Sequence, residues 1–138
     1  MATRPLAFPG SSWWITAELF VRQGTLAMFG VAALLLSTLA ILLQTIDPRL
    51  LESGVNVWVK PAKFFGSIGI FALTAAWFFG YVRPERRHSR LMRTTVTMLI
   101  LSGTFELLWI CWQAGQGLES HFNKDTPFNS IMYSLMGL

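Results

Sequence analysis

The chain has 138 residues, of which 53% are hydrophobic and only 13% are charged, and its formal net charge at pH 7 is +4. The charges lie between long uncharged segments, which excludes a soluble domain, because a soluble chain of this size needs a charged surface on every element. The basic residues lie beside apolar segments, as in membrane proteins, so we also exclude a nucleic acid as partner. The sequence therefore predicts an all-α, polytopic transmembrane protein, a single domain over residues 1–138 with the lipid bilayer as its solvent.

The first predicted element is an amphipathic helix at about 11–22. Ser11 or Ser12 can cap its N-terminus, and apolar residues recur at helical spacing against Glu18 and Arg22. This pattern favours a helix that lies at the membrane interface over an ordinary first turn of the next helix. It is not typical of a cleavable signal peptide, because the apolar run that follows comes too late and is too long.

Three long apolar runs follow, at about 25–46, 63–83 and 94–116. At about 1.5 Å per residue, each is long enough to cross a hydrocarbon core of roughly 30 Å. Each run is predicted to be a full membrane-spanning helix, since a backbone in lipid must satisfy its own hydrogen bonds. Small residues at a spacing of four predict that each of the first two helices packs closely against a neighbour, but they do not indicate which neighbour. They are Ala33 and Ser37 in the first run, and Ala72, Ala76 and Gly80 in the second.

The loop at 83–93 sets the predicted orientation. It contains five arginines and a single glutamate, and an excess of basic residues marks the cytoplasmic loops of membrane proteins. The N-terminus is then also cytoplasmic, while the loops at 47–62 and 116–127 lie outside. The predicted location is the inner membrane of a bacterial cell.

Polar and aromatic residues gather at the outer ends of the predicted helices and in the loop after the third. In a helix, Glu106, Trp109 and Gln113 share one face, because they are three, four and seven residues apart. We predict a ligand-binding site from this group. Its candidate residues are Lys60, Lys63, Glu106, Trp109, Gln113, His121 and Asn123.

Glu106 lies near the middle of the third run. A carboxylate at the centre of a membrane helix costs about 2.5–3.5 kcal/mol on insertion scales, so it is usually turned inward, paired or protonated. Two interpretations stay open: a proton-carrying or ligand-binding carboxylate, and a neutral side chain that bonds to a neighbouring helix. Lys63 can reach down toward Glu106, or it can extend up to the lipid headgroups.

His121 is a candidate for a single axial ligand of a haem or metal. Ligation by two histidines is not expected, because His88 falls in the opposite loop. The alternative is a loop histidine that caps the next helix or bonds to Glu119 or Asp125. No other metal site is predicted, and Cys111, the single cysteine, cannot form an intrachain disulfide.

A partial fourth helix is predicted at about 127–138. Thr126 is suited to cap it, and Pro127 is suited to its first turn. Eleven residues follow Pro127, about 16 Å at helical rise, which is half a membrane. We expect either a short piece that packs against a partner or re-enters the membrane, or a truncated sequence.

Two motifs resemble a family of uncharacterised bacterial multi-pass membrane proteins, in which W-x-K-P-x-K-F and S-H-F-N-x-x-T-P segments recur. The resemblance implies a polytopic helical fold but no activity. Members of that family are longer, with further helices after the second motif, so it also implies a truncated member. The matching residues are Trp58, Lys60, Pro61, Lys63 and Phe64, and Ser120, His121, Phe122, Asn123, Thr126 and Pro127.

The function predicted first is that of a subunit or accessory component of a larger membrane complex. Three helices with small-residue faces, an unfinished fourth helix and a buried glutamate suit one part of an assembly. The partners would be other membrane protein subunits or further copies of this chain. No cofactor is identified, and no enzymatic reaction is predicted, since there is no paired nucleophile and base, no metal-ligand spacing and no phosphate-binding glycine loop.

The alternative is a membrane protein that binds a small ligand or redox cofactor at an outward-facing polar site. A quinone headgroup or a haem propionate would suit the candidate residues, with Trp58, Trp109 and Trp112 as apolar walls. A third option is proton-coupled transport that uses Glu106. It is disfavoured because transporters usually assemble repeats around a midplane site, and the sequence has no repeat.

Overall fold

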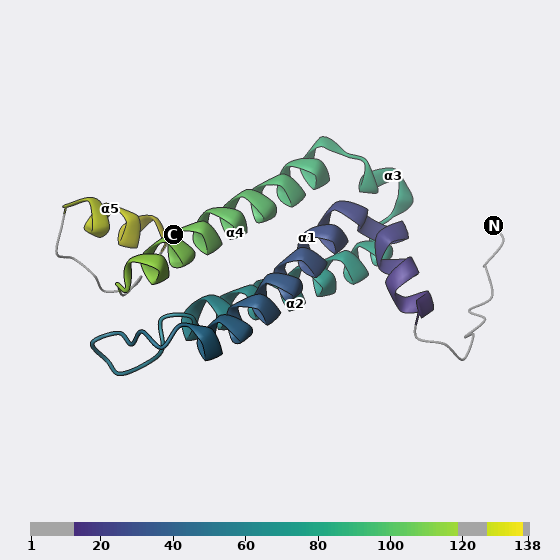
Figure 1. Cartoon of the computed structure of the whole chain (residues 1–138). Coiled ribbons are helices and arrows are strands. Elements are labelled where there is room, and N and C mark those ends of the chain that lie inside the picture. The colour runs from purple at the N-terminus through teal and green to yellow at the C-terminus, as the bar shows by residue number, and fades with distance from the viewer. Residues whose placement is uncertain (1–12, 119–126, 137–138) are drawn as a thin grey trace.

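The computed structural model describes residues 13–118 and 127–136, and these residues form helices joined by turns and one longer loop (Figure 1). Within this part of the chain there is no strand, only an isolated antiparallel bridge between Leu50 and Asn56. The predicted helical class is confirmed. The elements are α1 (Trp13–Ile46), α2 (Val59–Phe78), the 3-10 helix η1 (Phe79–Tyr81), α3 (Pro84–Arg87), α4 (Arg90–Gln116) and α5 (Pro127–Met136).

Three helical segments are long and apolar enough to cross a membrane: Trp14–Ile46, Val59–Tyr81 and Arg90–Gln116. They are compatible with an integral membrane protein. The second and third helices begin before the predicted 63 and 94, because the uncharged run marks the hydrocarbon and not the end of the helix. Pro61 lies in the first turn of α2, and the Ser89 hydroxyl accepts a hydrogen bond from the Met92 N–H, which caps α4.

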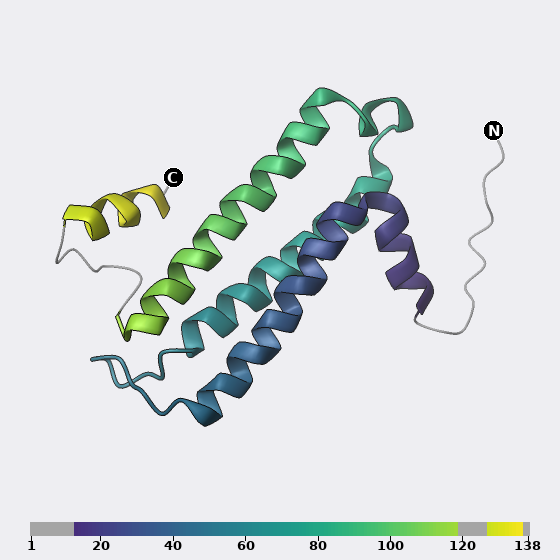
Figure 2. The same cartoon turned by 45° about the horizontal axis from the view of Figure 1, so that its top comes forward.

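Helix α1 is kinked at Gln23, whose φ of −154° and ψ of 86° are not helical. The first part of α1 turns away from the rest, as the purple ribbon shows (Figure 2). The side-chain oxygen of Gln23 accepts a hydrogen bond from the Thr25 N–H at 3.1 Å, which caps the second part. The first part overlaps the helix predicted at 11–22. Its place at a membrane interface stays a prediction.

Helices α1 and α2 form a close hairpin, because small residues line their contact. Gly30 and Gly69 face each other, and a Cβ added to either would lie 3.0 Å from the other's carbonyl oxygen. The Ser37 hydroxyl donates to the Ala62 carbonyl at 2.8 Å. Four of the small residues identified in the sequence are buried; they are Ala33, Ser37, Ala72 and Ala76.

Helix α4 packs mainly against α2 (Figure 2). Two clusters of buried side chains hold the three long helices together. One contains Leu26, Ala27, Ala76 and Val96, and the other contains Ala33, Phe65 and Leu107. Between the clusters the packing is incomplete, which leaves a cavity beside α4.

Candidate functional site

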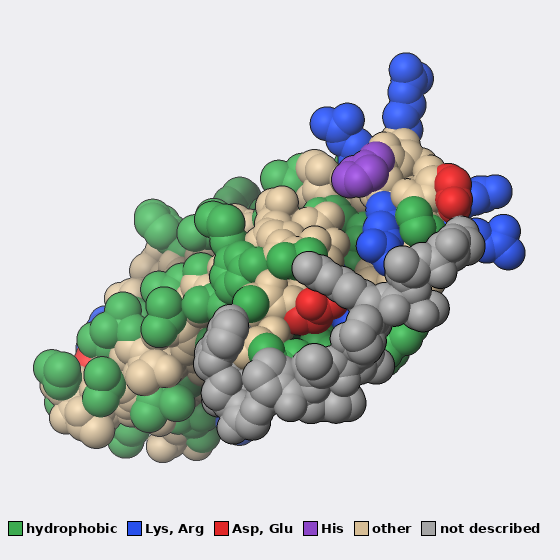
Figure 3. All heavy atoms as spheres, turned by 90° about the vertical axis from the view of Figure 1, so that its right-hand side faces the viewer, with side chains coloured by type: hydrophobic (Ala, Val, Ile, Leu, Met, Phe, Trp, Pro, Cys, Tyr) green, Lys and Arg blue, Asp and Glu red, His purple; other side chains and the backbone are tan. Residues whose placement is uncertain are grey.

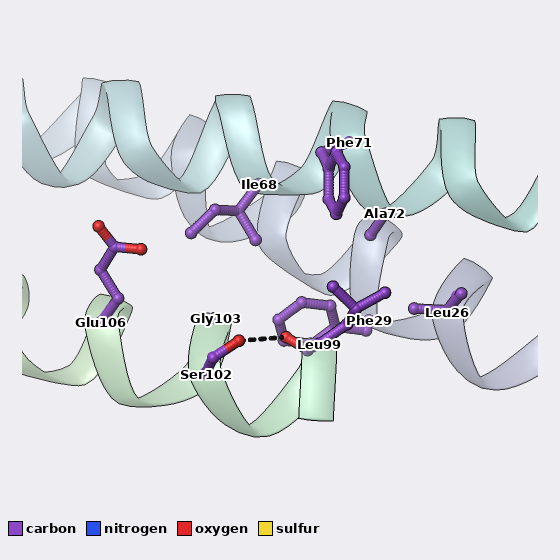
Figure 4. A pocket seen from close by; sticks show the side chains of 9 residues that line it. All are labelled: Leu26, Phe29, Ile68, Phe71, Ala72, Leu99, Ser102, Gly103 and Glu106. Atoms are coloured by element: carbon purple, nitrogen blue, oxygen red, sulfur yellow. Dashed lines mark hydrogen bonds between the residues drawn. The ribbon is translucent and has the colours of Figure 1, made fainter. Parts of the chain in front are cut away.

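The cavity between α4 and the α1–α2 hairpin has a volume of about 220 Å³. Its walls are mostly apolar, and Glu106 is the one ionisable residue among the described residues that line it. Figure 4 shows the Glu106 side chain at one end, directed from α4 toward α2, and the Ser102 hydroxyl donating to the Leu99 carbonyl at 3.3 Å. The lining residues are Leu26, Phe29, Ile68, Phe71, Ala72, Leu99, Ser102, Gly103 and Glu106.

Lys60 is the basic residue whose charge acts on Glu106. It lies in the first turn of α2, and its ammonium group interacts electrostatically with the Glu106 carboxylate. Its Nζ atom is also 5.9 Å from the centre of the Phe64 ring. Lys60, Phe64 and Ile68 recur every four residues, so they lie on one face of α2. The cavity therefore contains the Glu106 carboxylate, and Lys60, which is not one of its lining residues, adds a positive charge in the surroundings of that carboxylate.

Lys63, which the sequence analysis considered as a partner for Glu106, lies elsewhere. Its side chain is exposed, on a face of α2 that it shares with the exposed Ser67 and Ile70. A shift of three residues rotates a side chain about 60° around the helix axis. That rotation separates Lys63 from Lys60.

Trp109 and Gln113 are buried on α4 and meet α5. The Trp109 and Phe128 rings are in edge contact, with their centres 5.8 Å apart. The Gln113 side-chain amide donates to the Asn129 side-chain oxygen at 3.4 Å. Glu106 is thus at the edge of the shared face that the sequence predicted, next to the cavity, while the later residues of that face contact α5.

A second hollow, an open groove of about 400 Å³, lies between α4 and α5. It is almost entirely apolar, and the Trp112 side chain in it is 62% exposed. We call it the α4–α5 groove. Its residues are Phe105, Leu108, Trp109, Trp112, Phe128 and Met132.

The loop between α1 and α2 is held together by Trp58 and by three residues that the sequence did not indicate as important, Asp47, Arg49 and Asn56. The Asp47 carboxylate accepts hydrogen bonds from Arg49 Nη2 at 2.7 Å and from Trp58 Nε1 at 2.7 Å. Arg49 Nη1 donates to the Gly115 carbonyl near the end of α4, at 2.9 Å. The Asn56 side-chain amide donates to the Asp47 carbonyl. This network positions Trp58 at the start of α2, and so positions Lys60.

The same contacts shift the pKa values of Asp47 and Arg49. Hydrogen bonds from Arg49 and then from Trp58 hold the pKa of Asp47 well below its usual range. The hydrogen bond to Asp47 raises the pKa of Arg49 in turn. The pair is therefore charged at neutral pH. The only sign of this hydrogen-bond network in the sequence was Trp58, because an indole N–H needs an acceptor when it is partly buried.

His121 and Asn123 fall outside the described residues, as does most of the S-H-F-N-x-x-T-P motif. Within 13–118 and 127–136, no three histidine, cysteine or acidic side chains are grouped so that they could hold a metal ion. Cys111 is partly buried, against the cluster of Ala33, Phe65 and Leu107.

We compared the chain with protein-family models, with curated proteins and with solved structures, and none of the three comparisons found a match.

Proposed function

We propose that this protein is an integral membrane protein that binds a small ligand in the cavity between α2 and α4. The observation that supports this function is the cavity itself, which has apolar walls and Glu106 at one end, where the charge of Lys60 acts on the carboxylate. Ionisable groups inside a membrane are rare and tend to mark ligand or proton sites. An apolar pocket with a few converging polar groups has the composition of a small-molecule site.

A quinone headgroup is the ligand class that best suits this composition. A quinone oxygen accepts a hydrogen bond from the Lys60 ammonium, and a quinol hydroxyl donates to the Glu106 carboxylate. The volume of about 220 Å³ is below the roughly 300–1,000 Å³ of sites that enclose drug-sized ligands. The cavity is therefore large enough for a single quinone ring. The apolar tail of the quinone would extend between the helices into the lipid.

The test is a binding titration of the purified chain in nanodiscs with a short-chain ubiquinone. Glu106→Gln removes the charge at nearly constant volume, and Lys60→Gln removes the ammonium group. We expect each to weaken binding about 10-fold, or about 1.4 kcal/mol. Lys63→Gln is the matched control, because its side chain is exposed, and it should bind as the unaltered chain does. Equal affinity in all three variants, or no binding by the unaltered chain, would contradict the proposal.

The second candidate function is that of a subunit of a larger membrane complex, with other subunits or further copies of this chain as partners. The α4–α5 groove supports it, because an apolar hollow with an exposed Trp112 can receive a side chain from another helix. Trp112→Ala should then reduce the material that co-purifies in mild detergent. Leu101→Ala is the control, since Leu101 is exposed on the same helix outside the groove. A chain that is monodisperse and alone would count against this function.

We further propose the location in a bacterial inner membrane, with the N-terminus and the loop at 83–93 in the cytoplasm. Five arginines in that loop support the orientation. Cysteine labelling tests it, in a Cys111→Ala background so that each added cysteine is the only one. A membrane-impermeant maleimide should label Ser53→Cys on intact cells, and His88→Cys only after the cells are permeabilised. The reverse pattern would overturn the orientation.

Membership of the family that the two motifs resemble is likewise a proposal. It is supported by how the structure uses the first motif. Trp58 bonds to Asp47, Pro61 is buried in the first turn of α2, and Lys60 interacts with Glu106.

A further inference from the structure

Six arginines gather at the end of the molecule opposite the loop between α1 and α2. Only two glutamates, Glu18 and Glu85, are near them in sequence. Figure 3 shows the basic side chains protruding together at this end, around the exposed histidine. The arginines are Arg22, Arg83, Arg86, Arg87, Arg90 and Arg93.

Two of the six are occupied by contacts within the chain. Arg22 donates to the Trp77 carbonyl at 2.9 Å and pairs with Glu18 at 3.0 Å. Arg87 donates to the carbonyls of Gly80 and Val82. The carbonyls of Gly80 and Val82 lie where α2 and η1 end, and carbonyls at the end of a helix have no partner within the helix. The roles of Arg22 and Arg87 are therefore structural.

The other four have no such role. Their side chains are exposed, and no hydrogen bond or ion pair joins them to another side chain or carbonyl in the described part of the chain. We call them the arginine cluster. It consists of Arg83, Arg86, Arg90 and Arg93.

Aromatic residues of the kind found at membrane interfaces lie near the arginine cluster in the sequence and the fold. Trp14 and Trp77 are in ring contact, with their centres 6.4 Å apart, and the Tyr81 side chain is 72% exposed. Tryptophan and tyrosine are enriched where a membrane helix meets the headgroups. Arg83 follows Tyr81 by two residues, and Arg90 and Arg93 lie in the first turn or so of α4, so we expect the cluster to lie near the level of the lipid phosphates.

We propose that the arginine cluster binds the phosphate groups of acidic phospholipids. A guanidinium presents paired N–H donors that match two phosphate oxygens. Several arginines next to a membrane-spanning segment are typical of a site for anionic headgroups. A positive-inside orientation alone requires only that the loop carries a net positive charge. It does not require four exposed arginines without a side-chain partner in the described part of the chain.

The test is lipid retention by the purified full-length chain, measured by native mass spectrometry after exposure to phosphatidylglycerol or phosphatidylcholine. We expect several-fold greater retention of phosphatidylglycerol. Replacing all four arginines of the cluster by glutamine should abolish that preference, and Lys63→Gln, at the opposite end of α2, should keep it. If the fourfold variant does not fold, Arg86→Gln and Arg90→Gln alone should each lower the preference about 2-fold.

The result that would overturn the proposal is equal retention of the two lipids by the unaltered chain, or a preference that the glutamine variants leave unchanged. Inorganic phosphate, added at the same concentration as the lipid, separates the two sources of phosphate. A lipid site should keep its phosphatidylglycerol, because the acyl chains add to the affinity. Displacement by inorganic phosphate would indicate a site for a free anion and would also overturn the proposal.

Discussion

At the scale of single residues, Asp47 organises the side of the molecule on which Glu106 and Lys60 lie. Its carboxylate binds both Arg49 and Trp58, and Arg49 in turn binds the Gly115 carbonyl of α4. One carboxylate thereby connects the end of α1, the start of α2 and the end of α4. The position of Lys60 depends on this connection, because Lys60 follows Trp58 by two residues.

The low pKa of Asp47 predicts how this connection depends on pH. An aspartate in the unfolded chain has a pKa of about 3.9, and the folded value is lower because of Arg49 and Trp58. The folded state then binds fewer protons, so the contribution to stability is complete above about pH 5 and is lost as pH falls through the folded value. Thermal unfolding in detergent should show this acid loss, and Asp47→Asn should largely remove it. A loss between pH 5 and 7 would contradict the assignment.

At the scale of elements, the α1–α2 hairpin depends on the contact between Gly30 and Gly69. A Cβ at Gly69 would lie 2.9 Å from the Leu34 side chain and 3.0 Å from the Gly30 carbonyl. Gly69→Leu must therefore move the helices apart, and overpacking of this kind costs about 1–3 kcal/mol. Gly115→Ala is the control, since nothing lies within 4 Å of an added Cβ there. Thermal unfolding should show a lower midpoint for Gly69→Leu but not for Gly115→Ala. Equal midpoints for the two variants would contradict the close contact.

The first part of α1 is held against α2 by Arg22. Its guanidinium lies 4.0 Å from the centre of the Trp77 ring and also bonds to the Trp77 carbonyl. Hydrogen bonds of charged groups contribute about 1.5–3 kcal/mol. In Arg22→Met, hydrogen exchange of the amides at 14–21 should be at least about 10-fold faster. Arg90→Met should leave it unchanged, because Arg90 makes no comparable contact. Unchanged exchange in both variants would show that Arg22 does not anchor this segment.

At the scale of the whole molecule, the sequence was sufficient to predict three long apolar helices. Lipid imposes one requirement on every crossing segment, so the length of an uncharged run indicates a helix. The helix ends were less predictable, because Pro61 and Ser89 start helices outside the uncharged runs. Close packing of α1 and of α2 was also predictable, since small residues recur at helical spacing in both, but the sequence did not indicate that they pack against each other.

The site was less predictable, since it depends on how each helix is rotated. The contact of α2 with α1 sets the rotation of α2, and this turns Lys60 toward Glu106 and leaves Lys63 exposed. Two lysines three residues apart cannot be told apart without that contact. The bond between Asp47 and Trp58 spans eleven residues of loop, where no periodic pattern indicates which side chains meet.

The central claim is that a quinone-type headgroup occupies the cavity beside Glu106. Photo-crosslinking with an azido-quinone, followed by peptide mass spectrometry, tests it most directly. We expect labels on α2 at 64–72 and on α4 at 99–106, which decrease with excess ubiquinone and in Glu106→Gln. Labels confined to the α4–α5 groove, or labelling that neither excess ubiquinone nor Glu106→Gln reduces, would contradict it.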